Sequence, residues 1–415
     1  MFSNTKTITH NKEDVSMVRH ASLFSQLVAL FHRTRFHGLV YRHQAERYSK
    51  GFSSWSHFVA MLFCQLAQAK SLREICDGLS CTMGKLRHPG LKSAPKKSTL
   101  SYANAKRPWK MYRDLFYQTL QLCRTAAPQK HKFRFKNKLL SLDSSTISLC
   151  LSLFPWAKFR RTKGAIKLHL LLDHDGYLPT FAYISNGKKH DVTVARNVPL
   201  AAGSIVVVDR GYTDYKLFAA WTDNDIYFVT RLKDNADYTV IDERSVPENR
   251  NIISDHMIRL NGYNAKKACP HILRKVVVDD KDNNRQIVLL TNHMTLGAST
   301  ISAIYKDRWQ IELFFKAIKQ NLKIKTFVGT SENALMIQIW TALISMLLIK
   351  YLQFTSRFGW SLSNLVALLR WNLFTYRDLW DWIDNPFDVL PVEPEPVQYQ
   401  LPFRGLGQHR FKMAT

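Results

Sequence analysis

The chain has 415 residues, of which 46% are hydrophobic and 12% aromatic, a composition typical of a globular protein and not of a disordered one. This length is too great for one ordinary hydrophobic core, so we expect two or three domains. The 59 Lys and Arg residues exceed the 32 Asp and Glu residues. The resulting net charge of +27 makes a polyanion the expected partner: nucleic acid fits it best, and an anionic membrane surface is the rival.

The cysteines and the N-terminus argue against several classes of protein. The six cysteines include no CxxC pair, and no block of Cys and His has the spacing of a zinc site, so we expect reduced thiols in a cytoplasmic protein. The polar N-terminus carries no apolar segment of the kind found in signal peptides. Residues 334–352 approach the length of a bilayer span, but Gln338, Thr341 and Ser345 interrupt them, which favours a buried core helix.

Residues 1–132 are predicted to be helical and basic, with 22 Lys and Arg against 6 Asp and Glu. Ser71, with Glu74 three residues later, has the pattern of a capping box that begins a helix. After Pro95, the Ser-Thr-Leu-Ser segment 98–101 predicts the start of a basic helix. Such a helix suits insertion against DNA, although a basic bundle without a ligand is the alternative. The candidate DNA contacts in this region are Lys96, Lys97, Lys106 and Arg107.

From about residue 138 the pattern changes to short apolar strands separated by turns and helices. The predicted strands are 139–143, 166–172, 178–184, 204–209 and 226–230, with helices from about 192 and at 215–221. A turn at 173–176 joins the second and third strands. This order of three strands, helix, strand, helix and strand indicates a mixed α/β sheet.

Residues 234–300 interrupt that order with a predicted hairpin of 276–278 and 287–290, which we interpret as an inserted, mostly-β module. A charged helix, the apolar helix 334–352 and a helix at about 361–374 follow, and then a proline-rich tail that is expected to be extended or disordered. The expected domains are 1–132 (basic, helical, DNA-binding), 133–233 (α/β core, first part), 234–300 (β-rich insertion), 301–384 (core, second part, with C-terminal helices) and 385–415 (tail).

Two aspartates end predicted strands, which is where α/β sheets usually carry functional groups. If the strands that end at Asp143 and Asp209 are neighbours, their carboxylates converge, and Glu312 can reach them from a helix packed on the sheet. Three such carboxylates repel one another unless divalent metal neutralises them. Two Mg²⁺ ions about 3.5–4 Å apart would hold a phosphodiester for in-line displacement. Each aspartate could instead cap a turn, and Glu312 could pair with neighbouring cations.

The helix that carries Glu312 has two stripes. Its apolar stripe, at spacings of three, four and seven, predicts one buried face made of Ile304, Ile311, Phe314, Phe315 and Ile318. Its charged stripe consists of Arg308, Glu312, Lys316 and Lys319. A carboxylate flanked by three cations is by itself typical of a solvated helix face. Together with the two strand-end aspartates, it is better interpreted as a metal ligand among cations that bind DNA.

The spacing Tyr305-x2-Arg308-x3-Glu312-x6-Lys319 resembles the Tyr-Arg-Glu-Lys signature of DDE transposases of the bacterial insertion-sequence-4 family. The segments 142–146 and 207–212, which contain the two aspartates, resemble the first two acidic motifs, and the likeness extends from about residue 20 to about 380. It implies an RNase H-like core, a mixed sheet flanked by helices, interrupted by the β insertion and preceded by an all-α domain. It also implies cut-and-paste transposition, in which flanking DNA is cleaved and 3′-OH ends are transferred to a target.

The same resemblance implies roles for individual residues. The catalytic metal ligands would be Asp143, Asp209 and Glu312, holding two Mg²⁺ ions for which Mn²⁺ can substitute. The contacts to phosphates near the transposon end would be Tyr305, Arg308 and Lys319, with Lys316 as a further one. Arg offers a bidentate fork, Lys a point charge and Tyr a hydroxyl, so the chemistry of these residues suits the role.

Three further positions are less determined. Trp309 resembles an aromatic residue that holds a flipped base in related hairpin-forming transposases, although it could also be a core residue. His190 and Asp191 resemble a recurrent pair, and they either support the metal site or, as slightly favoured, cap the next helix. The residue after Arg210 is Gly211, whereas some relatives have an acidic residue there, so no acidic role is assigned to that position.

The implied partner is double-stranded DNA, at both the transposon ends and the target, with a homodimer in the synaptic complex and neither a membrane nor a small-molecule substrate. The implied location is the cytoplasm, at the nucleoid. Two alternatives share the sequence features: an RNase H-like nuclease that cuts without joining, and a catalytically silent DNA-binding protein derived from a transposase. Products of strand transfer into a target plasmid distinguish the first alternative, and any metal-dependent cleavage excludes the second.

Overall fold

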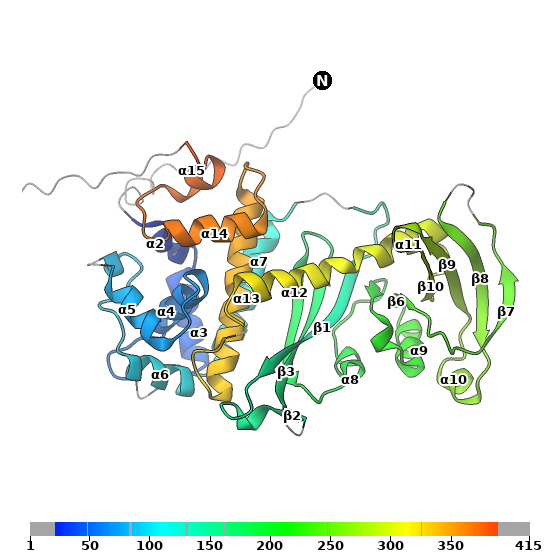
Figure 1. Cartoon of the computed structure of the whole chain (residues 1–415), viewed down its shortest axis with the longest axis horizontal. Helices are drawn as coiled ribbons and strands as arrows, with labels where there is room; N and C mark the ends of the chain where they lie inside the picture. Colours follow the sequence, from blue (N-terminus) through cyan, green and yellow to red (C-terminus); the bar gives the residue numbers. More distant parts are fainter. Residues whose placement is uncertain are drawn as a thin grey trace, which may run out of the picture.

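The computed structural model describes residues 21–388 except 48, 83–84, 129–131, 161–162, 247, 249 and 325. Within this part the chain is elongated, with helices gathered at one end and a mixed sheet extending to the other (Figure 1). Two sequence-based expectations fall outside it: the polar N-terminus within residues 1–20, and the proline-rich tail from residue 389 on.

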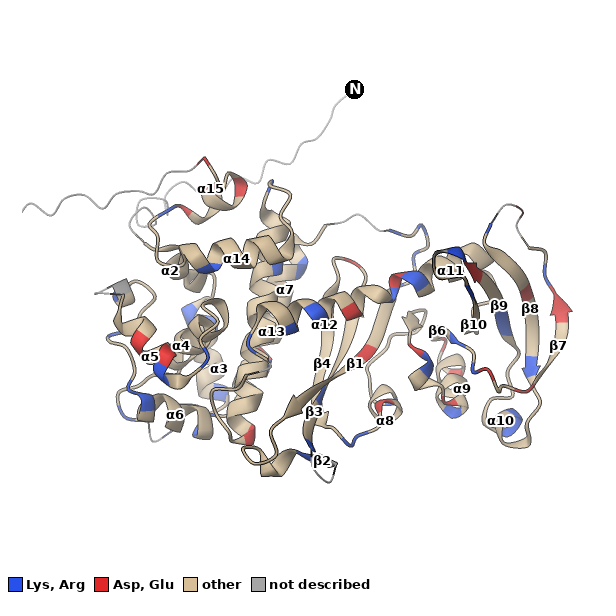
Figure 2. Ribbon diagram, viewed as in Figure 1, with Lys and Arg blue, Asp and Glu red and all other residues tan. Residues whose placement is uncertain are grey.

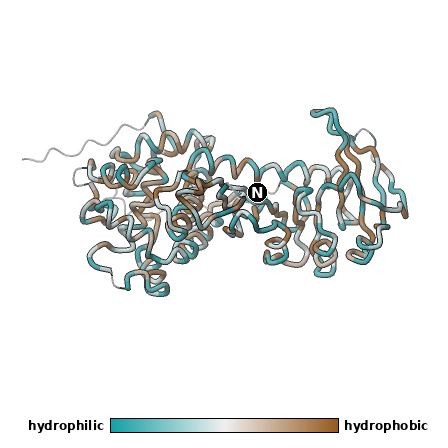
Figure 3. Tube along the Cα trace, turned by 60° about the horizontal axis from the view of Figure 1, so that its bottom comes forward, coloured by the Kyte–Doolittle hydropathy of each residue, from teal (hydrophilic) through white to brown (hydrophobic). Residues whose placement is uncertain are grey.

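The helical end contains residues from both termini of the described chain. Its N-terminal helices are α2 (Leu23–Ala29), α3 (Arg33–Arg42), α4 (Ser54–Leu66), α5 (Leu72–Ser80), η2 (Lys85–Arg87), α6 (Lys97–Lys106) and α7 (Trp109–Ala126). Its C-terminal helices are α13 (Glu332–Thr355), α14 (Leu362–Asn372) and α15 (Leu379–Asp384). The two sets form one core, and the hydrophobic positions concentrate in the interior of this end (Figure 3). Because of this packing, the C-terminal helices complete the N-terminal helical body.

Local capping explains several of these helix starts. The capping box at Ser71 is confirmed, because its hydroxyl accepts the Glu74 N–H at 3.1 Å and the Glu74 carboxylate accepts the Lys70 N–H at 2.8 Å. The predicted basic helix after Pro95 is present as α6, but Ser98 does not cap it. The helix begins at Lys97, and its N-cap residue Lys96 makes no side-chain capping bond.

The prediction that Arg107 contacts DNA is also wrong, because its side chain is buried. The residue is 6% exposed, and its guanidinium donates to the carbonyls of Ser53, at 2.8 Å, and Phe52 while lying over the Phe52 ring. Arg107 therefore supplies hydrogen-bond donors, from inside the protein, to the backbone carbonyl groups that directly precede α4. The other three candidates, Lys96, Lys97 and Lys106, are exposed.

In the part of the chain that the structure describes, the sheet contains ten strands. They are β1 (Leu139–Leu149), β2 (Lys158–Arg160), β3 (Lys163–Asp173), β4 (Leu178–Asn186), β5 (Ile205–Val207), β6 (Tyr227–Arg231), β7 (Tyr238–Glu243), β8 (Ile252–Leu260), β9 (Leu273–Asp280) and β10 (Arg285–Thr291). Strands β4, β3 and β1 are antiparallel neighbours, and β5 and β6 continue the sheet parallel to β1. The order β4-β3-β1-β5-β6, with helices on both faces, is the RNase H-like arrangement that the sequence led us to expect.

The β-rich insertion is confirmed as β-rich, but it is not a separate module. Strand β10 pairs antiparallel with β6, so β10, β9, β8 and β7 continue the same sheet. The expected hairpin is present, with Val276 opposite Leu289. Its apolar side chains share a core with β1, β5 and helix α11 (Ala298–Asp307). The physical reason is that β6 pairs with β5 along one edge and with β10 along the other. The hydrogen-bonded sheet therefore continues without a break from the core into the insertion.

The sheet is covered on both faces. On one face, Leu142, Val206 and Val208 pack against α8 (Asp191–Ala195) and α9 (Tyr215–Asp223). On the other face lie α11 and α12 (Trp309–Asn321), which follow each other across the strands as one long rod (Figure 1). Alternate residues of a strand point to opposite faces, so the odd-numbered residues of β1 and β5 face this rod. Two shorter elements, η4 (Arg210–Tyr212) and α10 (Tyr263–Ala268), sit at the ends of strands.

Helix α13 is the apolar segment that approaches the length of a bilayer span. It is long and apolar enough to cross a membrane by composition, but 89% of its apolar window is buried inside the protein. Its polar residue Gln338 is satisfied internally by donating to the carbonyls of Lys323 and Thr326. The expectation of a core helix is confirmed.

Candidate active site

The α11–α12 rod positions the charged stripe against the sheet. Ile304, Ile311 and Ile318 are fully buried, as the apolar spacing predicts. Arg308 lies between the two helices with helical backbone angles, φ −51° and ψ −31°, so the backbone passes from one helix to the next without unwinding. The side chains on either side of this junction are therefore held in a fixed relation to β1.

The structure corrects the expected position of Asp143. The sequence placed it at the end of a strand, but β1 continues through it to Leu149. What ends near Asp143 is the pairing with β5, whose register matches Leu139 with Ile205 and Ser141 with Val207. Continued by two residues, that parallel register places Asp143 level with Asp209 and on the same face. The two aspartates therefore approach each other where β1 and β5 separate: Asp209 lies just past the end of β5, as expected, whereas Asp143 lies within β1.

Arg308 bridges two of the three predicted carboxylates. Its Nη2 lies 2.5 Å from Oε1 of Glu312, and its Nη1 lies 3.7 Å from Oδ2 of Asp143. The guanidinium is only 13% exposed, and its Nε–H is buried without a hydrogen-bond partner. The pairing with Glu312 is the i,i+4 contact that the alternative interpretation of the charged helix predicted. In this state Arg308 is the cation shared by the acidic residues.

Asp143 is the carboxyl group whose ionisation is most affected. Burial raises its pKa to about 7, and the nearby charges of Asp209 and Glu312 act in the same direction, while the Ser144 N–H and Arg308 oppose them. Burial and like charges both disfavour a second and third anion in a shared space. A carboxyl group whose pKa is raised first by burial and then by two neighbouring carboxylates indicates a site that can receive positive charge.

Asp209 is held by the turn that follows it. Strand β5 ends at Val207, and Asp209 is the N-cap of η4, with its Oδ1 accepting the Gly211 N–H at 3.0 Å. It therefore does cap a turn, as the alternative interpretation proposed, and the bond uses one of its two oxygens. A Cβ at Gly211 would lie 3.1 Å from that same Oδ1, so the absence of a side chain there lets the turn close on the carboxylate.

Two hollows flank the rod, and the predicted residues divide between them. An open groove of about 440 Å³ is lined by Asp143, Glu312, Lys316 and Lys319, among others. Lys319 also reaches β1, donating to the Thr146 carbonyl at 3.3 Å. Tyr305, Arg308 and Trp309 line a second cavity, of about 340 Å³, against the β9–β10 hairpin. Lys and Arg positions occur along the rod among acidic ones (Figure 2).

Tyr305 and Trp309 differ in burial. Burial raises the pKa of Tyr305, whose ring lies 5.8 Å from the Arg308 guanidinium. The Trp309 ring is 55% exposed at the mouth of the second hollow. The alternative that Trp309 is a core residue is therefore wrong.

The chemistry of the three carboxylates fits a divalent cation, since hard cations prefer carboxylate oxygens. Among the described residues, no group of three or more Asp, Glu, His or Cys side chains is close enough to enclose an ion as the side chains lie. The reason is visible in the site, because Arg308 stands between Asp143 and Glu312. A metal ion held here would balance the negative charge that the guanidinium now balances.

The structure decides between the two interpretations of His190 and Asp191. His190 is the N-cap residue of α8 but makes no side-chain capping bond, so the slightly favoured capping role is wrong. Asp191 instead accepts from the Ser144 hydroxyl at 2.7 Å and from Lys167 at 3.0 Å. These bonds tie α8 to β1 and β3 directly beside Asp143, so Asp191 supports the residue that follows the first carboxylate.

Sequence reasoning missed one buried acidic residue of the rod. Asp307 is 3% exposed and lies three residues after Ile304 and four before Ile311, so it belongs to the apolar stripe. A carboxylate at a buried helical position is a signal in itself, since such a charge requires partners. Those partners, which include His174 and Lys132, come from distant segments and leave no local pattern.

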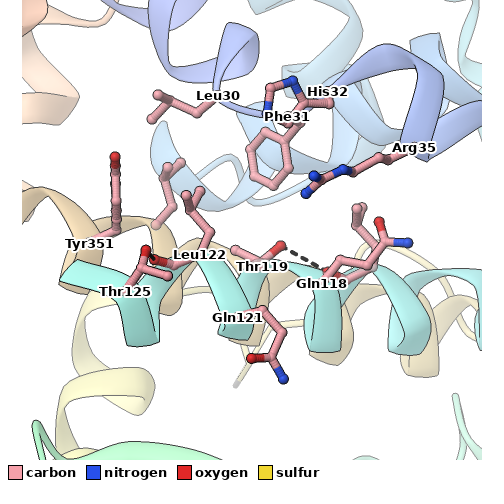
Figure 4. Close-up of a pocket in the computed structure, with 12 residues that line it drawn as sticks. Leu30, Phe31, His32, Arg35, Gln118, Thr119, Gln121, Leu122, Thr125 and Tyr351 are labelled. Carbon is pink, nitrogen blue, oxygen red and sulfur yellow. Dashed lines mark hydrogen bonds between the residues drawn. The ribbon is translucent and has the colours of Figure 1, made fainter. Parts of the chain in front are cut away.

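An apolar hollow in the helical end is unrelated to these groups. It has a volume of about 230 Å³ and lies between the α2–α3 connection, α7 and α13, lined by residues such as Phe31, Leu122 and Tyr351 (Figure 4). It shares no lining residue with the carboxylate groove. The candidate active site is therefore the groove beside the rod.

A helical body joined to an RNase H-like sheet, with two carboxylates on the sheet and a third on the long helix that crosses it, is typical of a DNA-processing enzyme of the transposase class. Residues 134–348, just over half of the chain, match the family described as the transposase DDE domain. The chain belongs to this family and is a transposase of the insertion-sequence type. Residues 19–92 match a second family, a domain of unknown function named DUF4372.

Three relatives agree with this family. A protein of Sinorhizobium fredii named as transposase y4zB is 30% identical over 307 residues, which cover 73% of this chain and 84% of the relative. A Geobacillus stearothermophilus protein named as the transposase of insertion sequence element IS5377 is 28% identical, covering 61% of this chain and 67% of the relative. A Synechocystis protein named for element IS4SA is 25% identical, covering 66% and 76%.

One solved structure is similar over most of the chain. It is a piggyBac transposase synaptic complex with hairpin DNA, which matches 87% of this chain and 82% of its own with 12% identity and a TM-score of 0.43.

Proposed function

We propose that this transposase binds double-stranded DNA at the terminal inverted repeats of its element, cleaves it and transfers the 3′-OH ends to a target. The observation that carries the proposal is the meeting of Asp143, Asp209 and Glu312 at one gap of the sheet, with the pKa of Asp143 raised to about 7 by burial and by the other two carboxylates. A phosphodiester adds further negative charge, so the site needs cations from both the protein and the solvent.

The three carboxylates would hold two Mg²⁺ ions, with Mn²⁺ as a substitute. When bound, the ions would activate the attacking hydroxyl and stabilise the leaving oxygen of the phosphodiester. The protein supplies the positioning: β1 and the η4 turn fix the two aspartates, and the rod brings Glu312 over them. Arg308 would exchange its carboxylate partners for a phosphate, for which its planar fork is suited.

The two hollows beside the rod support a path for the DNA. Lys316 and Lys319, in the carboxylate groove, would contact phosphates of the strand that is cut, together with Tyr305 and Arg308. The exposed Trp309 ring would stack on an unpaired base, which is worth about 1–3 kcal/mol per base. Such stacking suits a hairpin intermediate. On the helical body, Lys96, Lys97 and Lys106 would contact the duplex farther from the cut.

Synapsis of two element ends further implies a homodimer on DNA, acting in the cytoplasm at the nucleoid. In this proposal, residues 1–132 would hold the duplex, together with the C-terminal helices α13–α15 that pack on them. Residues 133–233 and the rod at the start of 301–384 would carry the chemistry, and residues 234–300 would widen the surface beside Trp309.

The test is cleavage of a labelled duplex that carries the DNA bordering the coding region, with an unlabelled plasmid as target. Asp143→Asn should lower the cleavage rate by about 10³-fold or more, because removing a metal ligand takes away several kcal/mol of transition-state stabilisation. DNA affinity, measured by fluorescence anisotropy, should change little. Asp242→Asn, which neutralises an exposed carboxylate on β7, is the matched control.

Cleavage by Asp143→Asn at the rate of the unaltered protein would contradict the assignment of the carboxylates. Cleaved ends that never join the plasmid would instead identify a nuclease without strand transfer. Cleavage that continues at the same rate after removal of metal with a chelator would contradict the metal requirement.

A further inference from the structure

A chain of buried polar side chains links β1 to the junction of the rod. The Ser141 hydroxyl lies 2.7 Å from Nε2 of His174, and Nδ1 of His174 lies 2.5 Å from Oδ2 of Asp307. Asp307 accepts two further bonds, from the Tyr177 hydroxyl at 3.2 Å and from Nζ of Lys132 at 2.5 Å. This Ser141–His174–Asp307 network is closed to solvent, because the three residues are 0%, 9% and 3% exposed.

The Asp307 carboxylate is charged despite its burial. Burial alone would raise its pKa, but the bonds from His174 and Lys132 outweigh that effect and lower it. A buried charge with this many donors has few alternative positions, since moving it would leave several polar groups without partners. The carboxylate therefore fixes the chain at the last residue of α11.

The turn that supplies two of the donors is held in a costly backbone conformation. It follows β3 and contains Gly176 at φ 79° and Tyr177 at φ 52°. A bulky residue rarely adopts a left-handed conformation, and such strain persists where the surroundings enforce it. Here the turn brings the side chains of His174 and Tyr177 to the same carboxylate, so its shape serves the network.

A hydrolytic role for this Ser-His-Asp arrangement does not fit its surroundings. Nucleophilic serines of such triads must reach a substrate carbonyl. Ser141 is fully buried in β1, with strands paired on both sides, β3 and β5. No substrate could approach its hydroxyl, so the arrangement acts on the protein itself.

Each end of the network lies close to a group of the active site. Ser141 precedes Asp143 by two residues on the same strand, so both side chains point to the rod. Asp307 immediately precedes Arg308, whose guanidinium reaches both Asp143 and Glu312. The network therefore links the same two elements as the site, β1 and the rod. On β1 it lies two residues from Asp143, and on the rod it lies one residue from Arg308.

We propose that Ser141, His174 and Asp307 are positioning residues that set the α11–α12 junction against β1, and thereby place Arg308 and Glu312 over Asp143 for DNA cleavage. The proposal rests on the proposed function. It adds residues that touch neither DNA nor metal but fix the geometry of those that do. Groups of this kind typically change metal affinity or activity by about 10–100-fold when they are altered.

The chain offers a matched control in the helical body. His57 is also fully buried, with its Nε2 2.8 Å from Oδ1 of Asn104 and its Nδ1 2.9 Å from the hydroxyl of Tyr112. It has the same kind of three-residue network, but it joins α4, α6 and α7 and touches nothing in the site. His174→Ala and His57→Ala should therefore both lower stability, and only the first should alter the chemistry.

The experiment uses the full-length chain below its unfolding temperature, with the folded fraction of each variant measured by circular dichroism. DNA binding is measured by anisotropy in Ca²⁺ with the labelled end duplex, and single-turnover cleavage is started with Mg²⁺. We expect His174→Ala and Asp307→Asn to cleave about 10–100-fold more slowly per folded molecule and to need more Mg²⁺ for half-maximal rate, with DNA affinity unchanged. His57→Ala should cleave at the rate of the unaltered protein.

His174→Asn provides a conservative rescue, because its amide nitrogen can take the place of Nδ1 and donate to Asp307. It should recover part of the cleavage rate that His174→Ala loses. Equal rates per folded molecule for His174→Ala, Asp307→Asn and the unaltered protein would overturn the proposal while leaving the proposed function intact. An Asp143→Asn variant that cleaves normally would overturn both.

Discussion

The ionic partners of Arg308 show how one residue can serve two states. Without DNA its guanidinium pairs with Glu312 and lies near Asp143, and the partial burial of these groups strengthens their attraction. Burial lowers the pKa of Arg308, but the bond to Glu312 and the nearby anions raise it overall. The residue is therefore a permanent cation that partly balances two of the three acidic side chains, Asp143 and Glu312.

A substitution at Gly211 tests whether the turn after β5 positions the Asp209 carboxylate. A methyl group added there would meet Oδ1 of Asp209 at 3.1 Å, which is closer than most such contacts. We expect Gly211→Ala to displace the Asp209 carboxylate and to lower the cleavage rate by roughly 10-fold or more, the effect typical of shifting a metal-ligand support. The single-turnover assay measures this.

Gly359→Ala is the control for that substitution, because a Cβ at Gly359 has no atom within 4 Å. It should leave cleavage unchanged. Cleavage by Gly211→Ala at the rate of the Gly359→Ala variant would show that the turn does not position Asp209.

At the scale of elements, buried polar residues fix how helices and strands meet. In the helical body, burial lowers the pKa of His57 to about 3, with the charge of Arg107 acting in the same direction and the bond to Asn104 opposing it. The native protein thus keeps this imidazole neutral. The unfolded chain would protonate it near its ordinary pKa of about 6.5.

This difference predicts acid sensitivity of the helical body. As pH falls from about 6.5 towards 3, the unfolded state binds a proton that the native state does not, so the free energy of unfolding decreases. The decrease from this one group approaches about 1.4 kcal/mol per pH unit. Urea unfolding followed by circular dichroism at pH 7 and pH 5 measures it.

His57→Gln removes the titrating group while leaving a polar side chain in place. The variant should be less stable at pH 7, but its stability should fall less between pH 7 and pH 5. An equally steep fall in both proteins would show that His57 is not the source of the pH dependence.

In the described part of the molecule, Lys and Arg positions occur both in the helical end and in the sheet end (Figure 2), and the whole chain carries a net charge of +27. Exposed lysines of α6 and its N-cap lie in the helical body, and others line the rod. A duplex held at the helical end and at the carboxylate groove would meet cations at many of its phosphates. Its affinity should fall steeply with salt, because each neutralised phosphate releases condensed counterions.

We expect replacement of Lys96, Lys97 and Lys106 by Ala to weaken DNA binding at all sequences. The slope of log affinity against log salt should become less steep by about 0.9 for each phosphate that the protein no longer neutralises. Anisotropy titrations with the same duplex across a range of salt concentrations measure both quantities.

Lys266→Ala with Lys267→Ala removes charge from exposed positions of α10, at the sheet end, and serves as the comparison. If this pair lowers the slope as much per charge as the α6 set, net charge and not local binding explains the affinity. If the α6 set leaves the slope unchanged, those lysines do not bind DNA.

The sequence was enough to establish the class of fold and the chemistry. Its periodicities predicted the helical N-terminal part, the strands and the buried face of the rod, because burial of a helix or strand face leaves a local pattern of spacing. The motifs singled out Asp143, Asp209, Glu312 and the cations around Glu312 as candidate site residues, and their roles stay predictions. Trp309, flanked by polar residues, was compatible with the exposed ring that the structure has.

The tertiary structure determines which charged side chains lie in contact with one another. Arg107 and Lys106 are adjacent in sequence, yet one is buried against Phe52 and the other is exposed, a difference set by packing against α4. Likewise, the partners of Asp307 and the register that aligns Asp143 with Asp209 come from segments far apart in the chain. A local sequence pattern indicates whether a position is buried. Which groups surround that position depends on the packing of segments that are far apart in the sequence.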